Sequence, residues 1–162
     1  MSDDTPFLDT LDAEALAALG LPAWPYGYRD RVRFYELDAL NHVNNVVFLR
    51  WFETIRVAYL KDYGLTDYSH TEADPELVVR HLSADYLAPV FQNETYIVTA
   101  RTKLVKPSSF IMEYAIHADG TLRATGDAVV VSLEQDGKTR RPHKALGLER
   151  MIARDGAEKV GF

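Results

Sequence analysis

The segment of residues 46–61 most constrains how this chain can fold, because it is apolar around most of a helical circumference. Its large apolar side chains recur at the three- and four-residue spacing of an α-helix, at Phe48, Trp51, Phe52, Ile55 and Tyr59. Only a narrow strip is left for charge, at Arg50, Glu53 and Arg56. A helix of this kind is covered on most sides, so the rest of the chain has to supply that cover. Gly64 is expected to end the helix.

Strand patterns before and after the helix supply the predicted cover. Alternating or continuous apolar runs indicate strands at residues 29–35, 77–87, 94–105, 109–117 and 121–133. Hairpin signals flank the last run, at Asp119-Gly120 and Asp136-Gly137. Residues 138–143 are expected to finish the meander, and residues 145–153 to form a terminal helix. The predicted fold class is α+β, with an antiparallel sheet wrapped around the central apolar helix at about residues 46–61.

Residues 1–27 are predicted to be an N-terminal extension to a single domain that spans residues 28–162. Thr10 is expected to cap a short helix that Gly20 ends, followed by an extended link that contains two prolines. A chain of 162 residues suits one domain and is long enough to bury a sizeable core.

Composition and charge exclude several classes of function. The net charge of −6 provides no basic field to attract nucleic acid. The absence of cysteine excludes disulfides, a thiol nucleophile and cysteine-based metal sites. The five histidines are scattered, and neither a glycine-rich phosphate loop nor a Gly-x-Ser-x-Gly motif is present, so no metal or cofactor is expected. No signal peptide or membrane span is evident, and we expect a cytoplasmic protein.

A carboxylate, Asp38, lies shortly before the expected start of the apolar helix, across a short polar loop. The start of a helix gathers unpaired backbone N–H groups and the positive end of the helix dipole. A carboxylate beside such donors suits acyl hydrolysis, because it provides a base or nucleophile next to groups that stabilise an oxyanion. The structural alternative is that Asp38 only caps the helix.

Asp38 belongs to a longer motif that continues into the helix. The motif consists of Glu36-Leu37-Asp38, His42-Val43-Asn44-Asn45 and, within the helix, Trp51-Phe52-Glu53 and Arg56. In this motif, and over about residues 29–143, the chain resembles the hotdog-fold acyl-CoA thioesterases, in particular the 4-hydroxybenzoyl-CoA and long-chain acyl-CoA thioesterase groups. The resemblance implies a hotdog fold and hydrolysis of an acyl-CoA to free acid and CoA, with an active site between subunits. Pairing of sheet edges between copies also favours a homodimer or a dimer of dimers.

The resemblance further implies roles for residues of the motif. Asp38 matches the catalytic carboxylate, which either attacks the thioester or activates a water molecule. The backbone N–H of Asn45 matches the donor that polarises the thioester carbonyl. Independently of the resemblance, His42 is predicted to line the substrate site, as a general base or a contact to the thioester carbonyl, and its structural alternative is a loop histidine bonded to backbone. Asn44 is also predicted to contact the substrate, and its structural alternative is a turn or helix N-cap residue. Phe48 departs from the family, many members of which carry Tyr there.

Two further residues are predicted to bind the CoA moiety. Lys106 is placed to meet a phosphate, and Ser109 to donate a hydrogen bond to a phosphate or to the pantetheine. A solvated strand face and a hairpin turn explain the same two residues equally well. Glu53 is a reserve candidate for the catalytic carboxylate, and its structural alternative is an ion pair with a neighbouring arginine of the helix.

Two other functions are compatible with the sequence. A non-catalytic acyl-CoA-binding hotdog protein would keep the pocket without hydrolysis. A 3-hydroxyacyl thioester dehydratase needs a positioned histidine with an acidic partner, and the sequence assigns no such partner to His42. Aromatic, short-chain and long-chain acyl groups all fit the pattern, as do CoA and acyl carrier protein as the carrier.

Overall fold

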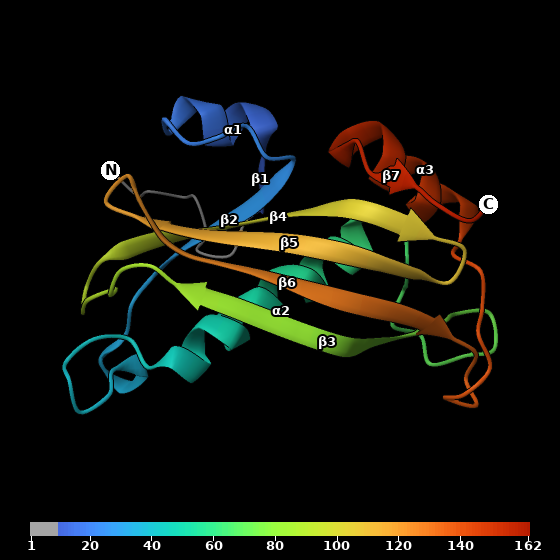
Figure 1. Ribbon diagram of the computed structural model, residues 1–162, viewed down its shortest axis with the longest axis horizontal. Coiled ribbons are helices and arrows are strands. Elements are labelled where there is room, and N and C mark those ends of the chain that lie inside the picture. The colour runs from blue at the N-terminus through green and yellow to red at the C-terminus, as the bar shows by residue number, and fades with distance from the viewer. Residues whose placement is uncertain (1–9) are drawn as a thin grey trace. The chain divides into compact units, whose positions relative to one another are not determined.

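The computed structural model describes residues 10–162, which form a sheet of seven strands and three α-helices (Figure 1). The strands are β1 Thr10–Asp12, β2 Tyr26–Arg31, β3 Glu76–Tyr86, β4 Thr95–Lys106, β5 Ser109–Ala118, β6 Thr121–Leu133 and β7 Glu158–Lys159. The helices are α1 Ala13–Ala18, α2 Asn45–Asp62 and α3 Ala145–Asp155. The strand order is β1-β2-β4-β5-β6-β3, with antiparallel pairing of β1 with β2 and of β2 with β4. The predicted α+β class, a largely antiparallel sheet with an apolar helix packed against it, is confirmed.

The chain divides into two compact units, and the longest elements each contribute residues to both. The first unit holds the described residues up to Ile55, together with Ala84–Ala100 and Tyr114–Gly126. The second unit holds Arg56–Ser83, Arg101–Glu113 and Asp127–Phe162. The predicted division between an N-terminal extension and a domain at residue 28 stays a prediction.

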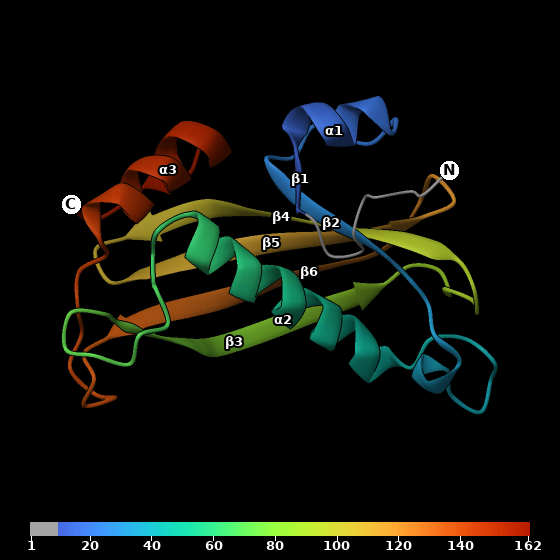
Figure 2. The same cartoon turned by 180° about the vertical axis from the view of Figure 1, so that it is seen from behind.

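Helix α2 lies along one face of the sheet (Figure 2). Its aromatic side chains contact the strands. In the first unit, the ring of Phe52 stacks on that of Tyr114 with their centroids 4.7 Å apart. In the second unit, the hydroxyl of Tyr59 lies 2.7 Å from the Thr102 hydroxyl. The apolar side chains that indicated the helix in the sequence are all buried, at Phe48, Trp51, Phe52, Ile55 and Tyr59. Arg56 differs from the prediction, because it is buried instead of lying on an exposed charged strip.

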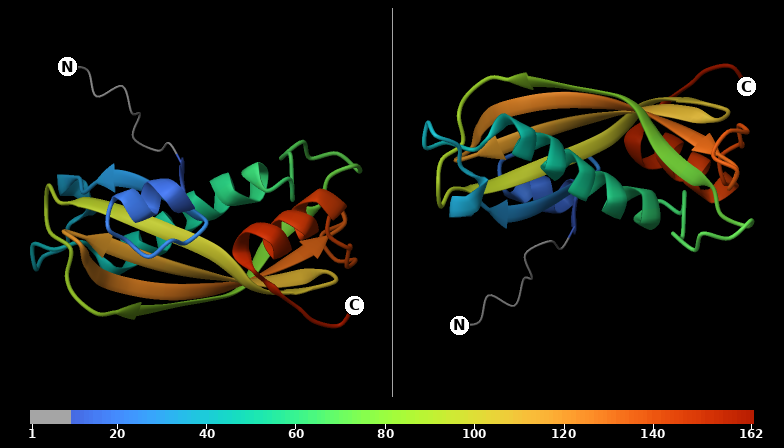
Figure 3. Two further views of the ribbon diagram at one scale, coloured as in Figure 1. Left: turned by 90° about the horizontal axis from the view of Figure 1, so that it is seen from above. Right: turned by 90° about the horizontal axis from the view of Figure 1, so that it is seen from below.

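The N-terminal helix begins later than predicted. Thr10 belongs to β1, and Asp12 caps α1 in its place, with Asp12 Oδ1 accepting a hydrogen bond of 2.9 Å from Ala15 N–H. Helix α1 lies against β2 (Figure 3), where Leu16 is fully buried. A β-carbon on Gly27 would lie only 3.1 Å from Leu16 Cδ2, so glycine allows this close approach. Residues 10–18 therefore add a strand and a covering helix to the first unit.

The strand predicted at residues 29–35 is displaced toward the N-terminus. It ends before Arg33, and Phe34–Glu36 form a single 3₁₀ turn. Two local contacts turn the chain here: Arg33 N–H donates to Glu36 Oε1 at 2.9 Å, and Arg33 Nη1 donates to Asp30 Oδ2 at 2.9 Å. These acidic side chains satisfy the backbone and side chain of Arg33 outside the sheet, which overrides the alternating pattern.

The C-terminal region also differs in part from the prediction. Residues 138–143 do not form a strand, although an isolated bridge joins Leu133 to Arg140. The predicted terminal helix is present as α3 and ends at Gly156, whose φ of +67° suits a glycine cap. Strand β7 was not predicted, because Glu158–Lys159 are too few residues to show a period, and they pair in parallel with β4.

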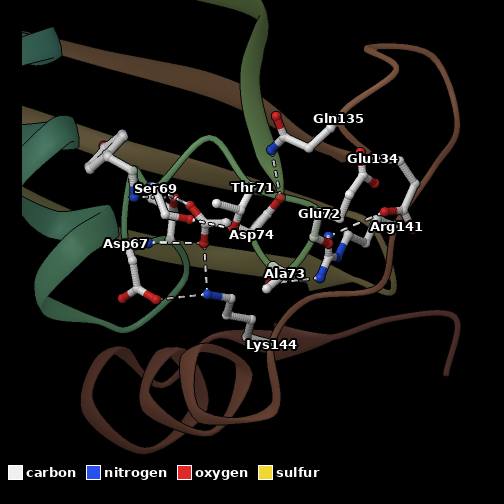
Figure 4. Close-up of polar contacts among 12 residues, drawn as sticks. Asp67, Ser69, Thr71, Glu72, Ala73, Asp74, Glu134, Gln135, Arg141 and Lys144 are labelled. Atoms are coloured by element: carbon white, nitrogen blue, oxygen red, sulfur yellow. Dashed lines mark hydrogen bonds and ion pairs between the residues drawn. The ribbon is translucent and has the colours of Figure 1, made fainter.

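A buried carboxylate holds the loop that precedes β3 (Figure 4). Asp74 accepts hydrogen bonds from Lys144 Nζ at 2.7 Å, from Thr66 Oγ1 at 2.6 Å, and from the N–H groups of Asp67 and Ser69. Burial opposes ionisation, but these hydrogen bonds, the one from Lys144 foremost, outweigh it and hold the pKa of the Asp74 carboxyl well below its usual value.

Candidate active site

A tight hairpin loop brings Asp38 and His42 together. Asp38 N–H donates to the His42 carbonyl at 2.9 Å, and Asn41 N–H donates to the Asp38 carbonyl at 3.1 Å. Asn41 has a φ of +61°, a conformation that asparagine adopts more readily than most residues. A bridge between Leu37 and Val43 closes the base of the loop. The local sequence thus folds back on itself just before α2.

The two side chains of this loop lie close to one another but do not form a short hydrogen bond. Asp38 Oδ1 is 3.9 Å from His42 Nδ1, and the two side chains are 29% and 33% exposed. Asp38 Oδ1 also accepts a hydrogen bond of 2.8 Å from Leu40 N–H, which fixes the carboxylate relative to the loop. A carboxylate has four acceptor positions, so the others remain for water or substrate.

Asn44 caps the start of α2. Its Oδ1 accepts a hydrogen bond of 3.0 Å from Val46 N–H, and its carbonyl accepts one of 2.9 Å from Val47 N–H. The expected N-cap role of the Asn44 side chain is confirmed. Asn45, the first residue of the helix, has an N–H for which residues 10–162 offer no hydrogen-bond acceptor. This N–H lies at the positive end of the helix dipole and is available to an oxygen of a substrate.

An open pocket of about 390 Å³ lies at this helix start. Its wall consists of Asp38, His42, Val43, Asn45, Phe48, Tyr86, Leu87, Ala88 and Pro89, all of which belong to the first unit. The structure therefore brings together the three residues predicted to matter most: the carboxylate, the loop histidine and the helix N–H. Apolar side chains complete the wall, as an acyl group would require.

Tyr86, at the end of β3, is a pocket residue that the sequence did not identify. Its hydroxyl donates a hydrogen bond of 2.8 Å to the Asn45 carbonyl, and its ring meets that of Phe48 edge-on at 5.2 Å. Burial raises the pKa of Tyr86, so the hydroxyl stays protonated and serves as a donor. Tyr86 and Asn45 are 41 positions apart. In the sequence, Tyr86 stands at the end of a strand pattern and in the segment Tyr86-Leu87-Ala88-Pro89, which shares in the resemblance to the thioesterases but gave Tyr86 no role.

Glu36 fixes the approach to the loop from the other side. Glu36 Oε2 accepts a hydrogen bond of 3.0 Å from Trp51 Nε1, and the Glu36 carbonyl accepts one of 2.9 Å from Asn44 N–H. The Trp51 ring in turn stacks on Tyr96 of β4 with centroids 3.8 Å apart. Glu36 therefore ties the residue before the helix to the helix itself and, through Trp51, to the sheet.

The remaining predicted site residues do not line this pocket. Lys106 and Ser109 lie in the second unit, at the turn between β4 and β5, and the Ser109 carbonyl is 3.2 Å from His143 Nε2. Glu53 is exposed on α2. Asn44 does not line the pocket either. The roles assigned to Lys106 and Ser109 in binding CoA, and to Asn44 in contacting the substrate, stay predictions.

The described part of the chain was compared with what a metal site and a membrane-spanning helix require. Across residues 10–162, no three His, Asp or Glu side chains gather as they would around a metal ion. Each helix in the same range is too short or too polar to cross a membrane.

A long apolar helix packed on a largely antiparallel sheet, with a carboxylate pocket at the helix start, defines the class of hotdog-fold thioester hydrolases. The chain belongs to this class through the thioesterase-like superfamily, whose family model matches residues 32–151. The family predicted from the motif is thereby confirmed, and the protein is a thioester hydrolase.

Individual relatives agree with this assignment. A thioesterase superfamily protein from Jannaschia sp. CCS1 has a solved structure that is 40% identical, with 94% of this chain and 97% of that chain covered and a TM-score of 0.89. A thioesterase from Thermus thermophilus, solved with coenzyme A and Zn, is 35% identical over 79% of this chain and 93% of that chain, with a TM-score of 0.67. The long-chain acyl-CoA thioesterase FadM of Escherichia coli (strain K12) is 27% identical over 119 residues, which are 74% of this chain and 87% of FadM.

Proposed function

We propose that the protein hydrolyses an acyl-CoA thioester to the free acid and CoA, with Asp38 as the catalytic carboxylate. The observation that carries this proposal is the shared pocket: Asp38 and Asn45, the first residue of α2, line one cavity whose other walls are mostly apolar. The carrier CoA is supported by two relatives, one solved with coenzyme A and one named for long-chain acyl-CoA.

In the general-base route, Asp38 takes a proton from a water molecule as the water oxygen adds to the thioester carbonyl carbon. The carbonyl oxygen becomes an oxyanion, which the Asn45 N–H and the helix dipole stabilise. The intermediate then re-forms its carbonyl and expels the CoA thiolate. The proton held by Asp38 passes to the thiolate or to solvent, which restores the carboxylate.

In the nucleophilic route, a carboxylate oxygen of Asp38 attacks the same carbon and expels the thiolate, leaving a mixed anhydride between Asp38 and the acyl group. Water then adds to the anhydride, releases the acid and regenerates Asp38. The Asn45 N–H serves the oxyanion in both steps. Both routes use the same residues.

His42 is proposed to line the substrate site, and its position also bears on the dehydratase alternative. The structure gives His42 the acidic neighbour that the sequence did not reveal, because Asp38 Oδ1 is 3.9 Å from His42 Nδ1. Hydrolysis is favoured over dehydration because the family and the named relatives are thioesterases. An assay for hydration of a 2-enoyl-CoA tests the alternative directly.

The decisive experiment is a thiol-release assay over a panel of aromatic, short-chain and long-chain acyl-CoA esters, run with the wild type and Asp38→Asn. We expect the wild type to release CoA, and the variant to lose at least about a thousandfold in kcat while still binding substrate. A folded Asp38→Asn protein with near-normal kcat would remove Asp38 from the mechanism. Binding of acyl-CoA by the wild type without release of CoA would instead identify a non-catalytic acyl-CoA-binding protein.

We also propose that the protein acts as a homodimer or a dimer of dimers, with the active site between subunits. Large apolar side chains are exposed around the loop and the pocket rim, at Phe34, Tyr35, Leu40, Leu87 and Phe91. β3 is the last strand of the sheet and exposes Val78 and Val79. Exposed apolar surface and a free strand edge are features that a second copy would cover. Light scattering after size-exclusion chromatography tests the assembly, and a monomer at micromolar concentration would refute it.

A further inference from the structure

Arg123, near the start of β6, is a buried cation that holds the segment of residues 87–94. Its side chain is 10% exposed, and Nη1 donates to the Pro89 carbonyl at 2.5 Å. The same guanidinium donates to both carboxylate oxygens of Glu94, from Nη1 at 3.1 Å and from Nη2 at 2.9 Å. Such a planar fork fixes its partners in orientation as well as in distance.

Arg123 and Glu94 together secure the segment along its length. The Arg123 carbonyl accepts hydrogen bonds from Leu87 N–H at 2.9 Å and from Ala88 N–H at 3.1 Å. Glu94 Oε1 accepts a further hydrogen bond of 2.8 Å from Phe91 N–H. A segment without regular secondary structure is thus fixed near its start by the Arg123 backbone, and at Pro89 and Phe91 by the two side chains of the ion pair.

This segment forms one wall of the pocket and contacts the Asp38 loop. Leu87, Ala88 and Pro89 line the pocket. The next carbonyl, on Val90, accepts a hydrogen bond of 2.8 Å from Val43 N–H, and a bridge then pairs the following residue with His42. A continuous set of contacts therefore leads from the ion pair to the pocket wall formed by Leu87, Ala88 and Pro89. It continues to His42 and Val43, which follow Asp38 in the loop.

We propose that the Arg123–Glu94 ion pair positions the wall formed by Leu87, Ala88 and Pro89, and thereby determines which acyl groups the pocket accepts. Arg123 does not line the pocket, so it is a positioning residue and not a catalytic one. The inference rests on the proposed acyl-CoA hydrolysis. It adds to that function a determinant of acyl specificity that lies outside the pocket.

The test compares Arg123→Lys with a matched control, Arg141→Lys. A lysine keeps the charge, but a single ammonium group cannot reproduce the fork to a carbonyl and two carboxylate oxygens. Arg141 makes an equivalent fork elsewhere (Figure 4), to Glu134 Oε2 and to the carbonyls of Glu72 and Ala73. None of these partners lines the pocket, so the control loses a similar fork without moving the wall.

The readout is the ratio of kcat/KM for butyryl-CoA to kcat/KM for the bulkiest acyl-CoA ester that the wild type hydrolyses. This ratio does not depend on the fraction of folded enzyme, so a merely structural role leaves it unchanged. We expect Arg123→Lys to shift the ratio by about tenfold and Arg141→Lys by less than about twofold, since pocket contacts discriminate acyl groups on this scale. Glu94→Gln keeps the side-chain volume and is expected to shift the ratio in the same direction as Arg123→Lys. If Arg123→Lys does not fold, the ratio measured for Glu94→Gln tests the proposal alone.

An unchanged ratio in Glu94→Gln and in folded Arg123→Lys overturns the inference while leaving the proposed hydrolysis intact. If the wild type releases no CoA, the proposed function fails, and dissociation constants for two non-hydrolysable thioether analogues replace the kinetic ratio. A shifted ratio of these constants in the variants still supports positioning by the ion pair. An unchanged ratio, or no binding by the wild type, overturns it.

Discussion

At the scale of single residues, the hydroxyl of Tyr86 ties the wall of the pocket to the start of the helix. Tyr86 donates to the carbonyl of Asn45, the residue whose N–H is proposed to polarise the substrate. Its ring meanwhile packs edge-on against Phe48. One side chain therefore supports both the orientation of the first helical peptide groups and the apolar surface facing the acyl group.

Replacing Tyr86 by Phe separates these two contributions. The ring contact with Phe48 is kept and only the hydrogen bond to Asn45 is lost. Because such a bond contributes about 0.5–1.5 kcal/mol, we expect kcat/KM to fall between about twofold and tenfold. Steady-state kinetics of thiol release measure the change. Tyr68→Phe is the matched control, since the Tyr68 hydroxyl also donates to a carbonyl of α2, on Val57 at 3.1 Å, but Tyr68 does not line the pocket. Equal kinetics for both variants would show that the Tyr86 hydroxyl is not needed.

The sequence predicted the residues of the pocket that are neighbours along the chain. Asp38, His42 and Asn45 lie within one short loop and helix start, so their proximity follows from local folding. Tyr86 and Arg123 could not be predicted, because their contacts with the site depend on how distant strands are placed. A strand pattern gives the direction of a side chain but not the partner that it meets.

At the scale of elements, the periodicity of apolar residues predicted the bounds of the long helix well. The bounds of the short elements were instead determined by hydrogen bonds of nearby polar side chains. Helix α2 was expected at residues 46–61 and runs from Asn45 to Asp62. The strand expected at residues 29–35 was misplaced because Asp30 and Glu36 bind Arg33 and turn the chain. Hydrogen bonds between polar side chains and nearby backbone compete with regular structure, and an alternating pattern does not show them.

The cap of α2 offers a prediction at this scale. Asn44→Ala removes the acceptor for Val46 N–H, and we expect the free energy of unfolding to fall by about 1 kcal/mol. Urea denaturation followed by circular dichroism measures the loss. In the control Asn45→Ala, the neighbouring side chain is removed without loss of a cap, and a change within about 0.5 kcal/mol is expected. Similar losses in both variants would argue against Asn44 as the stabilising cap.

At the scale of the whole molecule, a buried carboxyl group, Asp74, and a half-buried one, Asp155, link stability to pH in opposite directions. Burial raises the pKa of Asp155, despite hydrogen bonds from Thr102 N–H and from two tyrosine hydroxyls. The pKa of Asp74 is lowered, because its hydrogen bonds to Lys144 and neighbours outweigh burial. Protonation in acid therefore favours the folded state at Asp155 and disfavours it at Asp74.

Asp74→Asn isolates the second of these effects. Because the folded pKa of Asp74 lies below the unfolded value of about 3.9, its contribution is fully present above that value and is lost as the pH falls toward the folded pKa. We expect the variant to lose about 3 kcal/mol at pH 7, as when one partner of a buried ion pair is removed. Calorimetric melting at pH 7 and pH 3 should show that the difference in stability between the variant and the wild type is smaller at pH 3.

Asp67→Asn serves as the control, because the Asp67 side chain is 76% exposed and its ion pair with Lys144 contributes little. A difference for Asp74→Asn that stayed constant between the two pH values would mean that packing of the loop, and not the charge of Asp74, stabilises this part of the protein.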